Sequence, residues 1–467
     1  MVGSTPNSPE TLSAERVLAR RDAACWFALA IASLAIAAVF SIVLVVGRTP
    51  VLAAVFASDV DFPRRSLVVH VNLSLGVWFF CILAGLFCLL PGARPRRMAP
   101  LAVGLSTIGT ILFIIPMFFR SATPVLSDYI LVLNNSLFFA GLIVFTVGII
   151  LNFIDPRMLP TRAVESDIPE AAQHGLRVAA LTFCVAIITM IGAHFSMPAD
   201  SSLLSYYQYL FWGGGHILQA VNVLGMLVVW LILLRYLTGR SVLPSAIATA
   251  LFVLILLPNL AGPFWTFGGA PQQWFTRLME FGIFPAVLIF LAYGIAALWR
   301  SKSTLDIKNP AFVGWVASAL MAVIGFILGG MITVSNTLIP AHYHANIGAV
   351  TVAYMAGTLI LLKEVGFTFP GPRIAAWQPA IYAVGQMIFV LGYAIAGKIG
   401  DAARKVYGQE PHHHPAQLIG MGIAGFGGAI ALVGGVIFVI IVINTVRKSR
   451  KHHDDLNASR ELMDISA

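Results

Sequence analysis

The stretch Ile339-Pro340-Ala341-His342-Tyr343-His344-Ala345-Asn346 lies near the start of one of the apolar segments of this 467-residue chain. A helix turns by about 100° per residue, so His342 and His344 would point about 200° apart at nearly the same height, only about 3 Å different. An ionisable side chain inside a membrane is costly and indicates function, which favours a metal centre on each face of one helix. The alternative is a pair of hydrogen-bonded histidines that pack neighbouring helices.

Apolar segments long enough to cross a bilayer recur along the whole chain. Hydrophobic residues make up 58% of it, charged residues only 10%, and the mean hydropathy is +0.87. A helix needs about 20 apolar residues to cross a hydrocarbon core of roughly 30 Å, so we predict an all-α polytopic membrane protein with about twelve transmembrane helices. The predicted spans are residues 24–47, 68–90, 99–119, 130–152, 175–195, 204–236, 243–261, 275–299, 311–334, 338–362, 376–397 and 417–446.

Basic residues gather in alternate loops and at both ends of the chain. Clusters at Arg94–Arg97, Arg300–Lys308 and Arg447–Lys451 account for much of the formal net charge of +9. By the positive-inside rule, this pattern places both termini in the cytoplasm, so the charge needs no nucleic-acid partner. We expect a cytoplasmic tail at residues 1–23, a membrane domain at 24–446 and a second cytoplasmic tail at 447–467.

Three predicted segments that run inward each carry histidine in their outer half. These are the segments of His70, of His216 and of the His342/His344 pair. His70 and His344 would clamp one haem iron from both sides, while His342 would hold a second haem from one side and leave a position open for a small ligand. His216 would face that open position and bind a further metal. The chain contains no CxxCH motif, so a covalently attached c-type haem is not expected.

Glycine and polar residues surround His216 in its segment. The run Gly213–Gly215 precedes it, and each glycine inside a helix costs about 1 kcal/mol relative to alanine. Such a run indicates that a macrocycle or a closely packed helix needs the space. Gln219 follows His216 at three residues and Asn222 at six, so the three form a partly polar helix face.

Two further polar residues are candidates for the site. Glu280 lies three residues after Arg277, a spacing typical of an ion pair on one helix face, or else of a carboxylate beside a metal or proton path. Asn259 lies at the end of the predicted span 243–261, where the stretch from Pro258 to Gly269 leads to the span 275–299. With Gln219, they are candidates to deliver protons or to bind a non-haem metal.

Three motifs resemble subunit I of the haem-copper oxidoreductases, the superfamily of oxygen reductases and nitric oxide reductases. Leu204 to His216 is similar to the family's YQxLFWxxGH motif in helix six, and Pro340 to His344 is similar to its PxHxH motif in helix ten. Arg404-Lys405 falls where the family keeps a basic pair at the haem propionates. The resemblance covers essentially all twelve predicted segments and implies a haem-copper oxidase subunit I-like bundle.

The resemblance implies a role for each histidine. His70 and His344 would bind a low-spin haem, His342 a high-spin haem, and His216 a non-haem metal opposite it. The two haems are expected to be of b type, with propionates bound by Arg404 and Lys405. Electrons would arrive from a subunit II, a cytochrome or a cupredoxin, or from quinol, in a bacterial inner membrane.

Departures from the family pattern determine the expected chemistry. Oxygen reductases of the best-known type follow the helix-six histidine with Pro-Glu-Val-Tyr, whereas this chain has Ile217-Leu218-Gln219-Ala220 and so lacks that glutamate and tyrosine. The family's helix-seven His-His pair maps to Gly262-Pro263, and its helix-eight lysine to Ile289. The second metal could therefore be iron as well as copper.

These departures favour reduction of nitric oxide over reduction of dioxygen. Four-electron cleavage of dioxygen needs an extra electron and proton, which the family's tyrosine supplies. The coupling of two NO to nitrous oxide and water needs two electrons and two protons, and the missing channel residues predict that no protons are pumped. An oxygen reductase with a modified site, a haem-bearing electron carrier or sensor without catalysis, and a transporter with histidine proton relays remain alternatives.

Overall fold

The computed structural model of the protein describes residues 9–48, 52–91, 98–158, 168–198, 200–268, 272–365, 367, 372–404 and 414–466. Almost all of the described chain is helical, and two three-residue strands form the only sheet within it. The α-helices are α1 (Pro9–Arg48), α2 (Phe62–Val71), α3 (Trp78–Cys88), α4 (Ala99–Ile114), α5 (Ser136–Phe153), α6 (Glu170–Phe195), α7 (Leu203–Thr238), α8 (Ser245–Asn259), α9 (Gly262–Phe267), α10 (Gln273–Gly282), α11 (Phe284–Arg300), α12 (Pro310–Gly330), α13 (Leu338–Glu364), α14 (Pro372–Lys398) and α15 (Pro415–Ser466). The shorter elements are η1 (Leu52–Phe56), η2 (Asn72–Val77), η3 (Ile115–Phe118), η4 (Pro156–Met158), β1 (Thr123–Val125) and β2 (Val132–Asn134).

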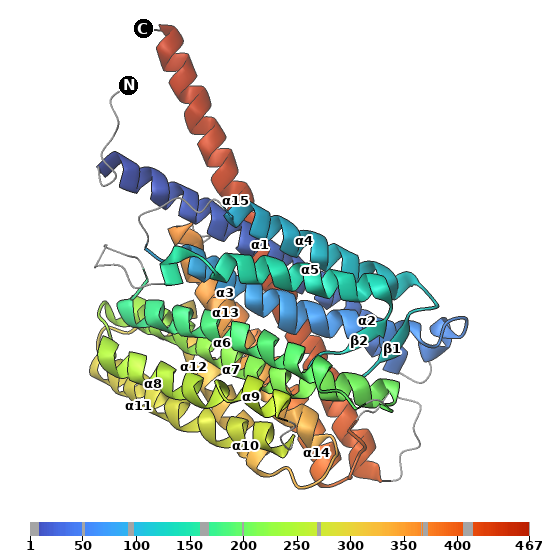
Figure 1. Cartoon of the computed structure of the whole chain (residues 1–467). Coiled ribbons are helices and arrows are strands. Elements are labelled where there is room, and N and C mark those ends of the chain that lie inside the picture. The colour runs from blue at the N-terminus through green and yellow to red at the C-terminus, as the bar shows by residue number, and fades with distance from the viewer. Residues whose placement is uncertain are drawn as a thin grey trace.

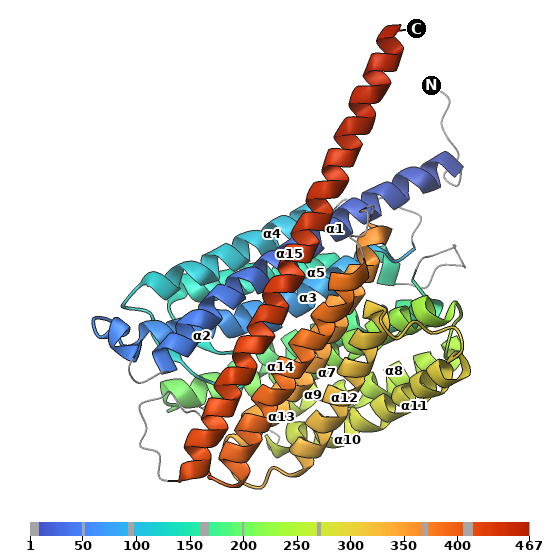
Figure 2. The same cartoon turned by 180° about the vertical axis from the view of Figure 1, so that it is seen from behind.

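Twelve helical spans in the described chain are long and apolar enough to cross a membrane. They overlap the twelve spans predicted from the sequence, so the all-α polytopic architecture is confirmed, and the chain is a multi-pass membrane protein. α1 begins at Pro9 and α15 runs to Ser466, so helix extends into both stretches that we expected to be tails. The start of α1 and the end of α15 project from the same end of the bundle (Figures 1 and 2).

The opposite end of the bundle carries the β1–β2 hairpin, and we call it the hairpin end (Figure 1). The two strands are antiparallel, with Thr123 paired to Asn134 and Val125 to Val132. α2 and α5 begin at this end, and the polypeptide between the strands reaches α7. The hairpin therefore covers the end of the bundle at which the predicted outer histidines lie.

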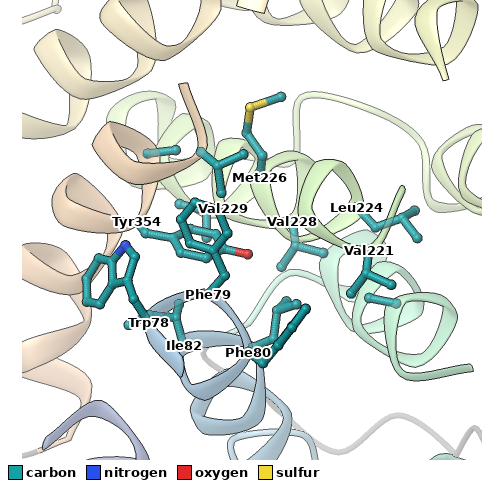
Figure 3. Close-up of a cluster of buried hydrophobic side chains, with 14 of the residues drawn as sticks. Trp78, Phe79, Phe80, Ile82, Val221, Leu224, Met226, Val228, Val229 and Tyr354 are labelled. Carbon is teal, nitrogen blue, oxygen red and sulfur yellow. The ribbon is translucent and has the colours of Figure 1, made fainter. Parts of the chain in front are cut away.

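α7 and α13 are the most deeply buried of the twelve spans. Figure 3 shows the centre of the core, where Trp78 and Phe79 of α3 lie against Val229 of α7 and Tyr354 of α13. The Tyr354 ring meets Phe79 edge-on with centroids 5.5 Å apart. Offset and edge-to-face pairs of this kind add to the stability that burial of the rings provides. This packing holds the helices of His216 and of the His342/His344 pair beside each other.

A segment of π-helix interrupts the span that carries His70. α2 ends at Val71, the π-helical segment η2 spans Asn72–Val77, and α3 continues from Trp78. A π-helical turn holds one residue more than an α-helical turn and is found often at functional sites. The irregular turn thus follows directly after the histidine that the sequence singles out.

Candidate functional site

His342 lies on α13 and faces α12. Its Nδ1–H donates a 2.7 Å hydrogen bond to the carbonyl oxygen of Gly325, which can only accept. The neutral imidazole therefore keeps its free lone pair on Nε2, the arrangement that metal-binding histidines typically have. A Cβ added to Gly329 would lie 2.7 Å from Cε1 and Nδ1 of the ring, so glycine at this position makes room for the imidazole.

His344 faces the other side of α13, toward α14. Its ring lies 4.7 Å from the Phe389 ring and 6.0 Å from the Tyr393 ring. Gln386 donates to the His344 carbonyl oxygen at 3.1 Å, and its amide nitrogen lies 3.5 Å from Nδ1 of the ring. The latter distance is at the limit of a hydrogen bond and leaves the tautomer open. As expected from helix geometry, the paired histidines face different neighbours.

His70 has the same kind of orientation as His342. It lies in the last turn of α2, and its Nδ1–H donates to the carbonyl oxygen of Ala37 on α1 at 2.8 Å. The lone pair of the neutral ring is again on Nε2. Two of the predicted iron ligands are thus held by backbone carbonyls of a neighbouring helix, in the tautomer that suits a metal.

His216 is buried, and the protein engages both of its ring nitrogens. Nδ1–H donates to the carbonyl oxygen of Trp212 at 2.7 Å, so Nε2 accepts from the hydroxyl of Tyr129, also at 2.7 Å. Burial raises the pKa of the Tyr129 phenol far above its ordinary value, and the nearby negative charge of Asp128 acts in the same direction. The phenol is therefore protonated at physiological pH and is the donor in this pair.

The glycine run before His216 accommodates protein side chains and a close helix contact. A Cβ on Gly213 would lie 2.7 Å from the Phe275 ring, and one on Gly214 would lie 2.8 Å from the Ala186 carbonyl oxygen of α6. A Cβ on Gly215 would overlap Tyr129. Of the two explanations that the sequence left open, close packing is therefore the one observed at Gly213–Gly215.

Tyr129 reaches His216 from the tip of the β1–β2 hairpin. The residue has φ = 66°, in the left-handed region that non-glycine residues seldom adopt. The neighbouring Asp128 is buried, and both of its carboxylate oxygens accept from Arg404, at 2.8 Å and 3.2 Å. This ion pair links the hairpin tip to the segment that follows α14. Our sequence analysis missed Tyr129, because no motif or spacing distinguishes a tyrosine in this loop.

The pairing with Asp128 differs from the role that the resemblance gave to Arg404. We expected Arg404 and Lys405 to bind haem propionates, yet in this structure the Arg404 guanidinium is bonded to a carboxylate of the protein itself. A guanidinium has five N–H donors, so donors remain beyond the two that Asp128 uses. Lys405 lies outside the described residues.

A cavity lies between α7 and α13. Its lining residues on these helices come after His216 on α7 and after His342 on α13. The volume of this cavity is about 20 Å³, enough for a water molecule, and α3 and α12 complete its walls. Most of the lining is apolar, but the amides of Gln219, Asn222 and Asn346 also line it. Within the described chain, Oδ1 of Asn222 is buried without a hydrogen-bond partner. Polar groups beside a cavity of this size can bind a buried water molecule.

The other two predicted polar residues lie apart from this cavity lining. Asn259 is buried at the end of α8, and its side chain donates to the carbonyl oxygen of Ile255 in the same helix at 2.7 Å. Glu280 lies on the exposed surface of α10. Of the candidates for proton delivery, only Gln219, on α7, therefore lines this cavity.

The residues present fit haem better than they fit a second metal. His70 and His342 offer neutral imidazoles whose Nδ1–H groups are already bonded to backbone carbonyl oxygens. At His216, by contrast, Nε2 is bonded to Tyr129, and no group of three or more His, Cys, Asp or Glu residues lies together in the described chain. Non-haem metals in proteins usually have at least three protein ligands. The donor set at His216 does not meet that requirement.

No known protein-family model matches the sequence. An uncharacterized protein of Aquifex aeolicus is 27% identical over 347 residues, which is 73% of this chain and 85% of that protein. An uncharacterized protein of Rickettsia prowazekii is 27% identical over an alignment of 497 positions that covers 90% of this chain and 95% of that protein. Both similarities cover most of this chain.

A solved structure identifies the fold. A heme-copper terminal oxidase, determined by cryo-EM as a dimer, is similar to this chain with a TM-score of 0.69 and 16% sequence identity. The similarity covers 92% of this chain and 84% of that chain. The chain therefore has the fold of the haem-copper terminal oxidases, and the bundle that the sequence motifs implied is confirmed.

Proposed function

We propose that this chain is the catalytic, haem-binding subunit of a respiratory oxidoreductase of the haem-copper oxidase type. The observation that carries the proposal is the shared orientation of His70 and His342, whose Nδ1–H groups each donate to a carbonyl of a neighbouring helix. That bond fixes the ring and leaves Nε2 as the nitrogen that would bind iron, as the outer partners of metal-bound histidines do. The haem-copper oxidase fold supports the same conclusion.

In this proposal, His70 and His344 hold a low-spin haem and His342 holds a high-spin haem. The haems would supply the electrons and an open iron position for a diatomic gas. Both haems are proposed to be of b type, and Arg404 and Lys405 remain candidates for their propionates. The protein's own part is to orient the imidazoles, to exclude water with the hairpin and the apolar cavity wall, and to bring protons to the gas.

We further propose that nitric oxide is the substrate, reduced to nitrous oxide without proton pumping. The reaction combines two NO, two electrons and two protons into N₂O and H₂O. Helix α7 carries Leu218 and Ala220 at the positions where oxygen reductases of the best-known type carry their glutamate and tyrosine. The amides that line the cavity can bond water and so support proton delivery. No step is assigned to a non-haem metal, because the His216 donor set does not fit one.

One observation favours dioxygen as a second candidate substrate. The phenol of Tyr129 donates to His216 in the described structure, so a tyrosine is present at this imidazole although α7 lacks one. A phenol there could supply the extra electron and proton that cleavage of dioxygen requires. The two substrates can be distinguished by turnover with each gas. If dioxygen is the substrate, turnover with dioxygen should depend on the Tyr129 phenol.

The proposal places the chain in a bacterial inner membrane with both termini in the cytoplasm. An electron-donating subunit II, cytochrome or cupredoxin would bind at the periplasmic side, which corresponds to the hairpin end. The charge pattern of the loops supports this orientation. Reporter fusions at each terminus test it.

The test is purification followed by pyridine-haem spectra, metal quantification and turnover with NO and with dioxygen. We expect two haems per chain, and loss of the low-spin spectrum in His70→Ala but of the high-spin spectrum in His342→Ala. His194→Ala, at an exposed histidine, is the matched control. A preparation without haem would overturn the proposal, whereas two haems without turnover of either gas would indicate a carrier or sensor. If the protein in liposomes pumps more than zero protons per turnover, the prediction that it does not pump protons is wrong.

A further inference from the structure

A series of aromatic rings connects the surface of the hairpin end with His216. The Trp274 ring lies 5.3 Å from Trp265, Trp265 lies 5.5 Å from Phe275, and Phe275 lies 6.4 Å from His216, measured between centroids. The Tyr129 ring lies 4.5 Å from His216 on the other side. All four separations lie within the range of roughly 4.5–7 Å in which aromatic rings interact directly.

The inner end of this series is arranged for oxidation of a phenol. The Tyr129 hydroxyl donates to Nε2 of His216, whose Nδ1–H donates to the carbonyl oxygen of Trp212. If Tyr129 loses an electron, its hydroxyl proton can move to Nε2 across the existing hydrogen bond. The resulting imidazolium has both N–H groups bonded, one to Trp212 and one to the phenoxyl oxygen, so the buried charge is stabilised by two charge-assisted hydrogen bonds.

The outer end of the series lies at the protein surface. Trp274 is 43% exposed, whereas Phe275, the next residue of α10, is buried against His216. Trp265 on α9 lies between them. Tryptophan and tyrosine are the aromatic side chains that are oxidised most readily, and they occupy both ends of the series. Burial explains why the inner rings pack together, but it does not explain why the series continues to an exposed tryptophan.

We propose that Trp274, Trp265, Phe275, His216 and Tyr129 form a path for single-electron transfer between the hairpin-end surface and Tyr129. The path rests on the proposed function, since a haem oxidised by a peroxide is the oxidant that it would serve. Tyr129 gives one electron to the oxidised centre and its proton to His216. An electron from Trp265 then restores Tyr129 while the proton returns, and Trp274 restores Trp265.

The electron balance predicts where an unrepaired oxidation ends. Without an external reductant, Trp274 loses two electrons and two protons and takes up the oxygen of one water molecule to become hydroxytryptophan. The same two electrons and two protons convert one hydrogen peroxide to two water molecules. The net change is therefore one oxidised tryptophan and one water molecule for each peroxide consumed.

The experiment treats the purified full-length holoprotein with hydrogen peroxide and maps oxidised peptides by mass spectrometry. We expect Trp274 to be oxidised several-fold faster than Trp377 on α14, although Trp377 is the more exposed residue at 69%. Trp265→Phe and Tyr129→Phe should each reduce oxidation of Trp274, while the control Trp377→Phe leaves it unchanged. Oxidation of Trp274 and Trp377 in proportion to their exposure, in every variant, would overturn the path.

A second measurement separates failure of the path from failure of the proposed function. Laser flash oxidation of the protein by ruthenium tris-bipyridine with a quencher needs no haem, so it applies even if no haem is bound. We expect a transient tyrosyl absorption that Tyr129→Phe abolishes and Trp265→Phe slows, with Trp377→Phe again as the control. Tyrosyl formation at the same rate in Trp265→Phe would contradict the path whatever the haem content. Unchanged haem spectra, or unchanged elution where no haem is bound, verify that each variant is folded.

Discussion

The imidazole of His342 on α13 is bonded through Nδ1–H to the carbonyl oxygen of Gly325 on α12, at 2.7 Å. The bond crosses between two helices that pack along their length. It fixes the tautomer of a histidine inside the bundle and therefore the direction in which the remaining nitrogen faces. Substitution of the α12 glycines near this bond can test how its geometry affects the protein.

Replacement of Gly329 by alanine should displace the His342 ring. The added Cβ would lie 2.7 Å from Cε1 and Nδ1, closer than non-bonded atoms approach, and overpacking of this kind costs about 1–3 kcal/mol. We expect a lower melting temperature and a reduced high-spin haem signal in the purified protein. Gly330→Ala is the matched control, because a Cβ there meets no atom within 4 Å. Equal haem content in both variants would contradict the role of Gly329.

Replacement of Arg404 by glutamine should loosen the hairpin tip. Asp128 is buried, and hydrogen bonds to charged groups contribute roughly 2 kcal/mol each, so we expect a clear drop in melting temperature. Arg64→Gln is the control, since Arg64 pairs with Asp61 at a site where both side chains are 45% exposed, and such pairs contribute at most about 1 kcal/mol. Limited proteolysis within the hairpin would report the loosening directly. Equal effects of the two substitutions would indicate that the Asp128 pair is not structural.

The Asp59–Arg65 pair at the hairpin end should make stability depend on acid. The buried Arg65 donates to Asp59 and to the carbonyl oxygen of Met117, and its hydrogen bond lowers the pKa of Asp59 below the ordinary value of 3.8. A carboxyl whose folded pKa is lowered contributes stability above its unfolded pKa and loses it as the pH falls through the folded pKa. We therefore expect the melting temperature to fall below about pH 4.

Asp59→Asn tests this dependence. The variant should melt lower than the wild type at pH 7, because Arg65 then has no charged partner at this site, and it should respond less to acid. Asp61→Asn, at the exposed pair with Arg64, is the control and should leave the acid response of the wild type intact. Circular dichroism melts from pH 7 to pH 3 provide the measurement. If Asp59→Asn loses as much stability in acid as the wild type does, other carboxyl groups cause the acid dependence.

The hydroxyl of Tyr354 in the core should be dispensable. Within the described residues it has no hydrogen-bond partner, and an unsatisfied buried hydroxyl costs free energy. Tyr354→Phe should therefore be neutral or stabilising in thermal melts. Gly225→Ala should destabilise, because its Cβ would overlap the Tyr354 hydroxyl oxygen. In the double variant the loss should be smaller than the sum of the two single changes, since the hydroxyl that clashes has been removed. Additive effects would contradict the contact.

The sequence was sufficient to predict most of the architecture. Apolar segment length alone located twelve spans, because backbone groups inside a membrane must be satisfied within helices. Helix periodicity also predicted that His342 and His344 face different neighbours, and the structure places one against α12 and the other against α14. Both predictions depend on local geometry, which a single segment determines.

Contacts between distant segments could not be predicted in this way. Tyr129 meets His216 across 87 positions of sequence, and Asp128 meets Arg404 across 276. Neither the tyrosine nor the aspartate belongs to a motif, so the reasons for the Gly213–Gly215 run and for the position of Arg404 became clear only in three dimensions. The joint binding of iron by His70 and His344 stays a prediction.

The π-helical turn at Asn72–Val77 changes how this span must be compared with its relatives. One extra residue in a helix rotates everything after it by about 100°, so the face that follows Trp78 is offset from the face that carries His70. An alignment that runs through this turn without a gap would match lipid-facing positions with core positions in one half of the span. A single-residue gap between Asn72 and Val77 restores the correspondence with any relative whose helix is regular there.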